Sequence, residues 1–342
     1  MHQIPTRKRS CLKLRVLCVT AAALVTAPFT SIASQSSALV IEEVLVTAQK
    51  KSESAKEVPM AIQAYSGDML ERSGVTNAAD LTQVTPGLTY AKSPANTPIF
   101  TIRGVGFNTS NLSSTPTVGL YVDEVSYAYP YMMNGMLYDM ERVEVLKGPQ
   151  GTLYGRNTTG GLVNFITNKP SSEFEAGFSI DVGNFETTNI DGYLNIPLSD
   201  SWAARVAGRV DRSREGWQKN AFDSSADELG EVEKWSLRGI LDGQVTDGLS
   251  ATLTVAYWED SSDTLAGQFI DTNFDQPPFA AQAVLDLPLD QRWDNDLAGW
   301  NAEGGPFGNP LETDSDFIST SLRVEYDLSD TVSLISLTSS PL

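Results

Sequence analysis

Side chains that could make or break covalent bonds are scarce in this chain. Both cysteines, Cys11 and Cys18, and the single histidine, His2, lie within the first 18 residues. The rest of the sequence therefore excludes thiol and imidazole nucleophiles, the Ser-His-Asp triad, disulfides and zinc sites built on Cys or His. Chemistry carried by carboxylates alone, such as glycoside hydrolysis, is compatible with this inventory.

The best material for carboxylate chemistry is the acid-rich stretch Asp286–Glu303, in which Trp293 and Trp300 are candidate platforms for a sugar. Hydrolysis of a glycosidic bond needs two carboxylates at a defined separation, and no two acids in this stretch have a spacing that indicates such a pair. An extracellular loop explains the acidic composition equally well. A secreted carboxylate-based glycoside hydrolase is therefore kept as an alternative, and we predict no enzyme, no catalytic residue, no metal site and no cofactor.

Residues 1–33 have the organisation of a secretory signal peptide. Five basic residues come first, the apolar run Val16–Phe29 follows, and Ser31–Ala33 is a small-x-small cleavage site. Removal of this segment leaves 19 of the 24 Lys and Arg against 43 Asp and Glu, a net charge of −24. Such an acidic chain is a poor partner for nucleic acid, whose phosphates need clustered cations.

The leader at residues 34–57 contains the segment IEEVLVTAQK, Ile41–Lys50, which we call the coupling segment. Two acids precede an apolar, β-branched run, which suits addition as a strand to the sheet edge of another protein. An ordinary first strand of the next domain explains the pattern equally well. Its place between an export signal and the charged tether Gln49–Glu57 predicts that it is exposed and mobile.

Residues 58–170 are expected to form one α+β domain. Ser66 is placed to cap a helix at Gly67–Arg72, and Asn77 to cap a second helix that ends at Val84. Five glycines interrupt Gly148–Gly161, where a phosphate-binding loop is disfavoured because no Gly-Lys-Ser/Thr and no long helix follow. The expected strands are Ala61–Tyr65, Ile99–Arg103, Val118–Val125, Arg142–Lys147 and Leu162–Thr167.

Four stretches together resemble TonB-dependent outer-membrane receptors. EEVLVTAQK is similar to the TonB box of that family, and FTIRGVG (Phe100–Gly106), VGLYVDEV (Val118–Val125) and RVEVLKGPQGTLYGRNTTGGLVNFITNKP (Arg142–Pro170) are similar to its plug domain. The resemblance implies binding of the coupling segment to TonB, with its inner-membrane energising complex, in the periplasm. The residues carried over for this contact are Glu43, Val44, Leu45, Val46 and Thr47.

The resemblance also implies that charged plug residues pair with the barrel wall, although solvent-facing strand positions explain them equally well. These candidates are Arg103, Arg142, Glu144, Lys147 and Arg156. Lys147 stands where the family more often has Arg, which puts a strong bidentate contact there in doubt.

Two plug loops are long enough to meet a small-molecule or metal-chelate ligand on the outer side, where the family binds its ligands. They are Gly106–Thr117 and Ser126–Gly135, and the second is rich in aromatic and Met side chains suited to a bulky, partly apolar ligand. Packing against the inside of the barrel is the alternative. The candidate ligand contacts are Phe107, Asn108, Tyr127, Tyr129, Tyr131 and Met132.

From residue 171 to residue 342 the sequence alternates between apolar and polar residues, as transmembrane barrel strands do. Short turns alternate with the longer connections Asp211–Lys234 and Glu259–Phe317, and aromatic residues near strand ends predict interfacial girdles. The expected strands are Phe174–Val182, Ile190–Leu198, Trp202–Val210, Trp235–Val245, Leu249–Tyr257, Ile318–Leu328 and a seventh from about Val332. The girdle candidates are Trp202, Trp235, Tyr257, Trp258, Phe317 and Tyr326.

A barrel that encloses a plug of this size needs about 22 strands. We therefore expect this chain to be a fragment with an incomplete barrel, and an α+β plug followed by antiparallel transmembrane β-strands. The expected function is TonB-dependent uptake of a scarce bulky solute, such as a ferric siderophore, across the bacterial outer membrane, whose lipid is expected to surround the barrel. A passive porin is disfavoured because it needs neither box nor plug.

Overall fold

The computed structural model describes residues 45–47, 50–51, 53–75, 77–92, 98–107, 115–134, 137–218, 228–263, 313–329 and 331–341. These residues all belong to one compact unit, Glu43–Leu342. The predicted signal peptide and the acid-rich stretch Asp286–Glu303 lie outside the described residues. No helix in the described ranges combines the length and the apolar character needed to cross a membrane.

The plug is built on a five-stranded sheet with the order β3-β8-β9-β6-β7. Its strands are β3 (Ile62–Ser66), β6 (Val118–Val122), β7 (Val125–Tyr127), β8 (Met140–Lys147) and β9 (Gly161–Thr167). All pairs are antiparallel except β6 with β9. Strands β4 (Leu88–Lys92) and β5 (Pro98–Ile102) form a separate antiparallel pair, and in the sequence they fall between β3 and β6. The mixed α+β architecture predicted for the plug is confirmed.

Helix α1 (Gly67–Arg72) has the predicted bounds, and the Ser66 hydroxyl accepts a hydrogen bond from the Met69 N–H as the predicted cap. Helix α2 is shorter than predicted and spans only Leu81–Val84. The Asn77 carboxamide oxygen instead accepts hydrogen bonds from the N–H groups of the turn before it, at Ala79 and Asp80. Asn favours such turns over helix interiors, which explains the later start.

The predicted single strand Val118–Val125 is in fact the hairpin β6–β7. Asp123 and Glu124 form its turn with positive φ angles of 47° and 68°. A two-residue turn with both residues at positive φ matches the twist of the strands it joins, and Asp tolerates that conformation. The sequence also did not mark β4, the short helix α3 (Gly151–Tyr154) or the 3₁₀ helix η1 (Pro130–Asn134).

Gly161 begins β9 at φ 138°, and a Cβ there would overlap the main-chain oxygen of Leu146 on β8. We expect Gly161→Ala to destabilise the plug by about 3 kcal/mol, because backbone strain and overpacking add in a buried sheet. Hydrogen exchange of the β8 and β9 amides measures this loss. Gly151→Ala is the matched control, since a Cβ at Gly151 would meet no atom within 4 Å; equal exchange in both variants would contradict the prediction.

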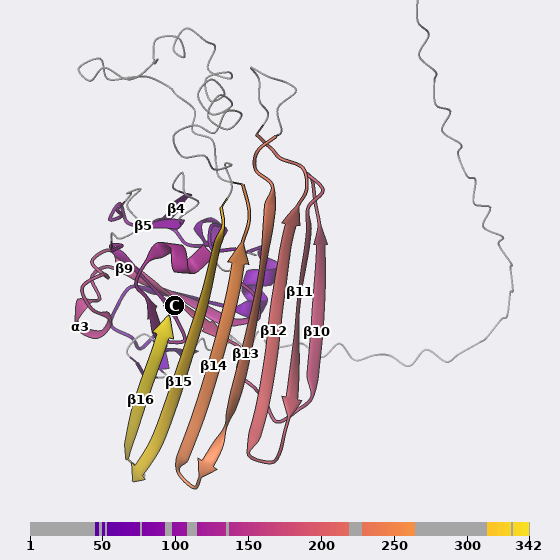
Figure 1. Ribbon diagram of the computed structural model, residues 1–342. Coiled ribbons are helices and arrows are strands. Elements are labelled where there is room, and N and C mark those ends of the chain that lie inside the picture. The colour runs from indigo at the N-terminus through magenta and orange to yellow at the C-terminus, as the bar shows by residue number, and fades with distance from the viewer. Residues whose placement is uncertain are drawn as a thin grey trace, which may run out of the picture. The chain divides into compact units, whose positions relative to one another are not determined.

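The wall is a seven-stranded antiparallel sheet whose strands follow chain order, as Figure 1 shows from β10 to β16. Each strand overlaps its predicted range. The strands are β10 (Glu175–Val182), β11 (Thr188–Pro197), β12 (Trp202–Ser213), β13 (Val232–Thr246), β14 (Leu249–Asp260), β15 (Ser315–Ser329) and β16 (Val332–Pro341). The predicted antiparallel strands are confirmed, and within the described residues the sheet is an open, unclosed wall.

The alternation along the wall strands separates two faces. Apolar residues such as Phe178, Val206 and Leu237 are exposed on the outer face. The neighbouring positions Arg205, Ala207 and Arg238 are buried on the inner face, beside the plug. Since successive side chains of a strand point to opposite faces, the same period places lipid-type residues outside and polar anchors inside.

Candidate functional site

The described part of the coupling segment lies on the plug sheet. Leu45–Val46 forms strand β1, which pairs antiparallel with β2 (Glu53–Ser54). The Val46 side chain is 0% exposed, whereas that of Leu45 is 51% exposed. Val46 packs in a cluster with Val58, Tyr121, Leu146, Tyr154 and Leu162.

Next to Val46, Thr47 forms hydrogen bonds with residues of the plug. Its N–H donates to Glu144 Oε1 at 2.8 Å, and the same oxygen accepts from Arg142 Nε at 2.8 Å. The Tyr154 hydroxyl donates to the Thr47 carbonyl oxygen at 3.3 Å. Burial raises the pKa of Tyr154, and the nearby Glu144 carboxylate adds to the rise, so the phenol keeps its proton at neutral pH.

This arrangement differs from the predicted exposed and mobile segment. The prediction rested on position in the chain, whereas Val46 is buried and Thr47 is bonded to a residue 97 positions away. Apolar burial and a charge-assisted hydrogen bond together outweigh the freedom of a short tether. Glu43 and Val44 lie outside the described residues, so their predicted part in TonB binding has no structural counterpart here.

Arg142 and Glu144 were predicted to contact the wall. The described residues instead join them to each other and to Thr47, and join Arg142 to its neighbour Glu141. Glu144 is a fully buried carboxylate on β8, between the buried residues Val143 and Val145. It thus serves as an internal acceptor of the plug, and any additional wall contact stays a prediction.

The other three charged candidates also lie away from the described wall. Lys147 Nζ donates to the Pro86 carbonyl oxygen at 2.5 Å, and Arg103 and Arg156 are exposed. Partial burial lowers the pKa of Lys147, and the neighbouring Arg103 guanidinium lowers it further. Within the described ranges none of the three forms an ion pair with an acid, and their pairing with a wall stays a prediction.

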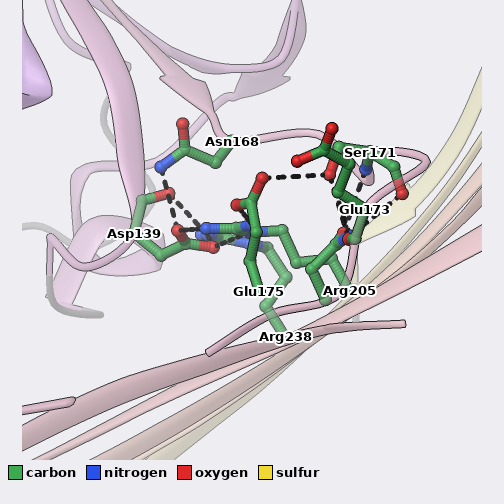
Figure 2. A network of polar contacts seen from close by, with 8 residues as sticks. Asp139, Asn168, Ser171, Glu173, Glu175, Arg205 and Arg238 are labelled. Carbon is green, nitrogen blue, oxygen red and sulfur yellow. Dashed lines mark hydrogen bonds and ion pairs between the residues drawn. The ribbon is translucent and has the colours of Figure 1, made fainter. Parts of the chain in front are cut away.

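The plug meets the wall through a buried network centred on Asp139, shown in Figure 2. Asp139 Oδ2 accepts from Arg205 Nε at 2.8 Å, and its Oδ1 from Arg205 Nη2 at 2.5 Å. Arg238 Nη2 adds contacts at 3.2 Å to Oδ2 and 2.9 Å to the Asp139 main-chain oxygen. One plug carboxylate, 4% exposed, therefore binds two arginines from the adjacent strands β12 and β13.

Aromatic rings and an amide complete this network. The Arg205 guanidinium lies 4.1 Å from the centroid of the Tyr193 ring, and that of Arg238 lies 4.7 Å from the Tyr138 ring. Asn168 donates to Asp139 Oδ1 at 2.9 Å. Planar guanidinium groups suit this combination of bidentate hydrogen bonds and ring contact, which lysine could not reproduce.

Two further contacts hold the plug to the wall strands. Arg323 on β15 lies 3.1 Å from Glu124 of the β6–β7 turn. Trp258 Nε1 donates to the Met132 carbonyl oxygen at 3.1 Å, and Phe317 packs edge-on against Tyr127 with ring centroids 5.4 Å apart. Trp258 and Phe317 are thus on the inner face and buried, which corrects their prediction as interfacial girdle residues.

The predicted ligand contacts fall into two groups. Tyr127 and Met132 are buried in the core between plug and wall, the alternative considered from the sequence. Tyr129 and Tyr131 are half-buried and stack with centroids 5.8 Å apart, and Phe107 is 50% exposed. Asn108 lies outside the described residues. Phe107 and the tyrosine pair are therefore the candidates whose surfaces a ligand could reach directly.

A polar cavity of about 250 Å³ separates part of the plug from the wall. Thr47 and Arg142 line it on one side, and Glu124, Arg323 and Glu325 are among its other charged residues. The coupling segment therefore borders both the plug sheet and a charged space beside the wall. In the described part of the chain no group of three or more His, Cys, Asp or Glu is placed to hold a metal ion.

Residues 54–162 match the family model of the TonB-dependent receptor plug domain. The chain therefore contains the plug domain of the TonB-dependent receptors. This family assignment and its outer-membrane localisation agree with those expected from the sequence. The family consists of transporters rather than enzymes.

Curated relatives match less than half of this chain. The pesticin receptor of Yersinia pestis is 37% identical over 129 residues, which are 37% of this chain and 19% of that protein. The ferripyoverdine receptor of Pseudomonas aeruginosa is 27% identical over 167 residues, which are 48% of this chain and 20% of that protein. The matched region thus spans about a fifth of the length of these relatives.

Solved structures show the same fold. The ferric yersiniabactin uptake receptor of Yersinia pestis has a TM-score of 0.61 at 22% identity, covering 82% of this chain and 40% of that chain. The ferripyoverdine receptor of Pseudomonas aeruginosa, bound to ferripyoverdine, has a TM-score of 0.60 at 15% identity, covering 83% and 34%. The arrangement of a plug beside antiparallel wall strands is therefore shared with these two receptors.

The anchors Asp139, Arg205 and Arg238 were not singled out from the sequence. Strand alternation places Arg205 and Arg238 at positions whose side chains face the inside of the barrel. A search of the wall strands for Arg and Lys at such positions would therefore have found both. Asp139 lies just before β8 and had no comparable signal. Its positive φ of 50° and its contacts depend on the assembled fold.

Proposed function

We propose that the receptor takes part in TonB-dependent active uptake of a ferric chelate across the outer membrane. The observation that carries the proposal is the coupling segment EEVLVTAQK, which is joined to a plug of the family and whose described residues lie directly on the plug sheet. An energy-transducing partner needs a strand-like segment on the plug to which it can bind, and the coupling segment provides one. A passive channel needs no such segment.

In the proposed cycle the solute binds at the outer side of the plug, where Phe107, Tyr129 and Tyr131 offer aromatic surface. TonB pairs with the coupling segment in the periplasm and transmits force derived from the inner-membrane proton gradient. The plug then rearranges beside the wall and the solute passes. No bond of the solute is made or broken.

The choice of a ferric chelate is supported by the relatives. Those with solved structures include receptors for ferric yersiniabactin and for ferripyoverdine, and the curated ones include a ferrioxamine receptor of Yersinia enterocolitica. Half-buried tyrosines also suit a bulky, partly apolar ligand. Carbohydrates, cobalamin and haem are the other cargo classes to be distinguished by experiment.

Two measurements test the proposal. The full chain, solubilised from outer membranes, is mixed with the periplasmic C-terminal domain of TonB, and retention of the receptor on immobilised TonB is the expected result. Transcript levels are then compared under iron starvation and with polysaccharide as carbon source. Failure to bind TonB would refute the coupling, and induction by polysaccharide but not by iron starvation would refute the ferric cargo.

A further inference from the structure

We propose that the solute passes between the plug and wall strands β14–β16, and that residues 124–134 of the plug move away from these strands to open the route. These residues carry β7 and η1, and we call them the gate arm. The plug stays fixed to β12 and β13 through Asp139 while the arm moves. The inference rests on the proposed function for the cargo, whereas its evidence is the unequal bonding of the plug to the two parts of the wall.

The contact of the plug with β12 and β13 has a fixed geometry (Figure 2). The Asp139 side chain, 4% exposed, binds Arg205 through both carboxylate oxygens and Arg238 through one. Pulling this carboxylate away would leave two buried guanidinium groups without their anion, which is strongly unfavourable. This part of the interface is therefore the pivot rather than the opening.

The ion pair between the gate arm and β15 is partly exposed to water. Arg323 lies 3.1 Å from Glu124, and the two side chains are 24% and 21% exposed. Arg323 also lies 3.7 Å from Glu325 on the same strand, so it keeps an acidic partner when Glu124 leaves. Ion pairs that water reaches contribute little to stability, so this contact is easily separated.

The other contacts of the gate arm with β14 and β15 are largely apolar. Tyr127 packs edge-on against Phe317, with ring centroids 5.4 Å apart, and Met132 lies in the same core cluster. Trp258 Nε1 donates to the Met132 carbonyl oxygen at 3.1 Å. Because apolar contact is non-directional, a bulky, partly apolar solute can cover these surfaces as the arm moves off them.

The gate arm is joined to the plug sheet by the shortest strand of that sheet. β7 lies at the sheet edge and pairs with β6 alone, over three residues, whereas the other edge strand, β3, pairs over five. Just before the arm, the Asp123 carboxylate accepts from the Thr167 N–H at 3.0 Å and from the Thr167 hydroxyl at 2.7 Å, which holds it to β9. The chain is thus fixed at Asp123 and at Asp139, and the gate arm between them can open locally at low cost.

A polar space already separates part of the plug from these wall strands. The cavity of about 250 Å³ is lined on the wall by the hydroxyl side chains of Thr252, Thr254 and Ser321, and on the plug by residues that include Glu124 and Thr167. Its volume and its polar lining suit several water molecules. Movement of the gate arm therefore has only to extend an existing polar space along β14 and β15.

The first measurement compares the mobility of the two sides of the plug without any transport. The mature chain has no cysteine of its own, because Cys11 and Cys18 lie in the predicted signal peptide. Tyr127 in the gate arm and Tyr138 beside the pivot are both 8% exposed, so they form a matched pair. In outer membranes from cells that lack TonB, we expect a maleimide to label the single variant Tyr127→Cys about tenfold faster than Tyr138→Cys.

Removal of the charge of the gate arm should act on one side only. Glu124→Gln, added to each variant, is expected to speed labelling about fivefold at position 127, the upper end for a partly exposed ion pair, and to leave position 138 unchanged. Glu141→Gln is the matched control, since Glu141 is also a plug acid beside an arginine but lies outside the gate arm. It should change neither rate.

The second measurement locks the gate arm during uptake by the full-length receptor. Glu124→Cys and Arg323→Cys are joined by a bifunctional thiol reagent that contains a reducible disulfide, and accumulation of iron supplied as a chelate is followed. Uptake should fall about tenfold or more on joining and return on reduction. As a control, the same reagent joins Ser171→Cys to Asn195→Cys, whose native side chains are 2.9 Å apart. This bridge ties the plug to β11, on the side that does not move, and should leave uptake unchanged.

Equal labelling of Tyr127→Cys and Tyr138→Cys, or undiminished uptake after the gate arm is joined to β15, would overturn the proposal. Loss of uptake on joining Ser171→Cys to Asn195→Cys as well would show that the whole plug must leave the wall, and would also overturn it. If the arm opens selectively in the labelling experiment but the unchanged receptor takes up no chelated iron, the moving arm is supported and only the proposed function is refuted.

Discussion

Asp139→Asn is expected to loosen the plug from the wall by about 3 kcal/mol or more. The asparagine keeps the size of the side chain and tolerates the positive φ of 50°, so the change isolates the charge. Arg205 and Arg238, each almost fully buried, would then face an amide that can accept at only one atom. An uncompensated buried charge is costly, whereas the intact network balances two cations with one buried carboxylate and nearby oxygens.

Hydrogen exchange of the β8 amides measures this effect, because local opening of the plug exposes them. A loss of this size makes exchange about a hundredfold faster. Glu175→Gln is the matched control: Glu175 lies 3.7 Å from Arg205 but its side chain is 45% exposed, and such pairs contribute at most about 1 kcal/mol. Exchange in Asp139→Asn no faster than in Glu175→Gln would contradict the prediction.

Val46→Pro is expected to weaken binding to the TonB C-terminal domain about tenfold or more and to abolish most uptake. Proline has no N–H to donate to a partner strand, and an acceptor left unsatisfied costs about 1–3 kcal/mol. The substitution also removes the side chain that packs against Tyr154 and Leu162, so the segment leaves the plug. It therefore presents a strand that lacks one of its main-chain donors.

Val46→Thr is the matched control, because threonine is β-branched, similar in size and keeps the N–H. It should retain most binding and uptake, measured as TonB retention and as accumulation of iron supplied as a chelate. If Val46→Pro binds TonB and supports uptake as the unchanged receptor does, strand addition through this segment is wrong.

Short-range patterns were sufficient for most of the secondary structure. The alternation in the wall predicted seven strands because a period of two depends only on which residues face the lipid and which face the plug. Ser66 and Gly67–Arg72 were predicted correctly, because a helix cap is decided within four residues. The errors at Asn77 and at Asp123–Glu124 also arose locally, where turn chemistry competed with a helix and with a continuous strand.

The site was less predictable. Glu144 was recognised as an unusual charge in an apolar strand, but its partner Thr47 lies 97 residues away and no local pattern joins the two. The same holds for Asp139, whose partners Arg205 and Arg238 come 66 and 99 residues later. Pairing between charges depends on register and on which faces meet, and these are properties of the assembled sheets.

The sequence by itself determined the family, the order of coupling segment, plug and wall strands, and the absence of cysteine and histidine after the predicted signal peptide. These properties follow from composition, from sequence motifs and from the two-residue alternation of strands, all of which can be recognised from residues close together in the sequence. Only the tertiary structure decided that Val46 is buried, that Glu144 holds Thr47, and that Asp139 anchors the plug to β12 and β13. The reason is physical: the stability of a buried charge depends on donors brought close in space, and the fold alone brings them there.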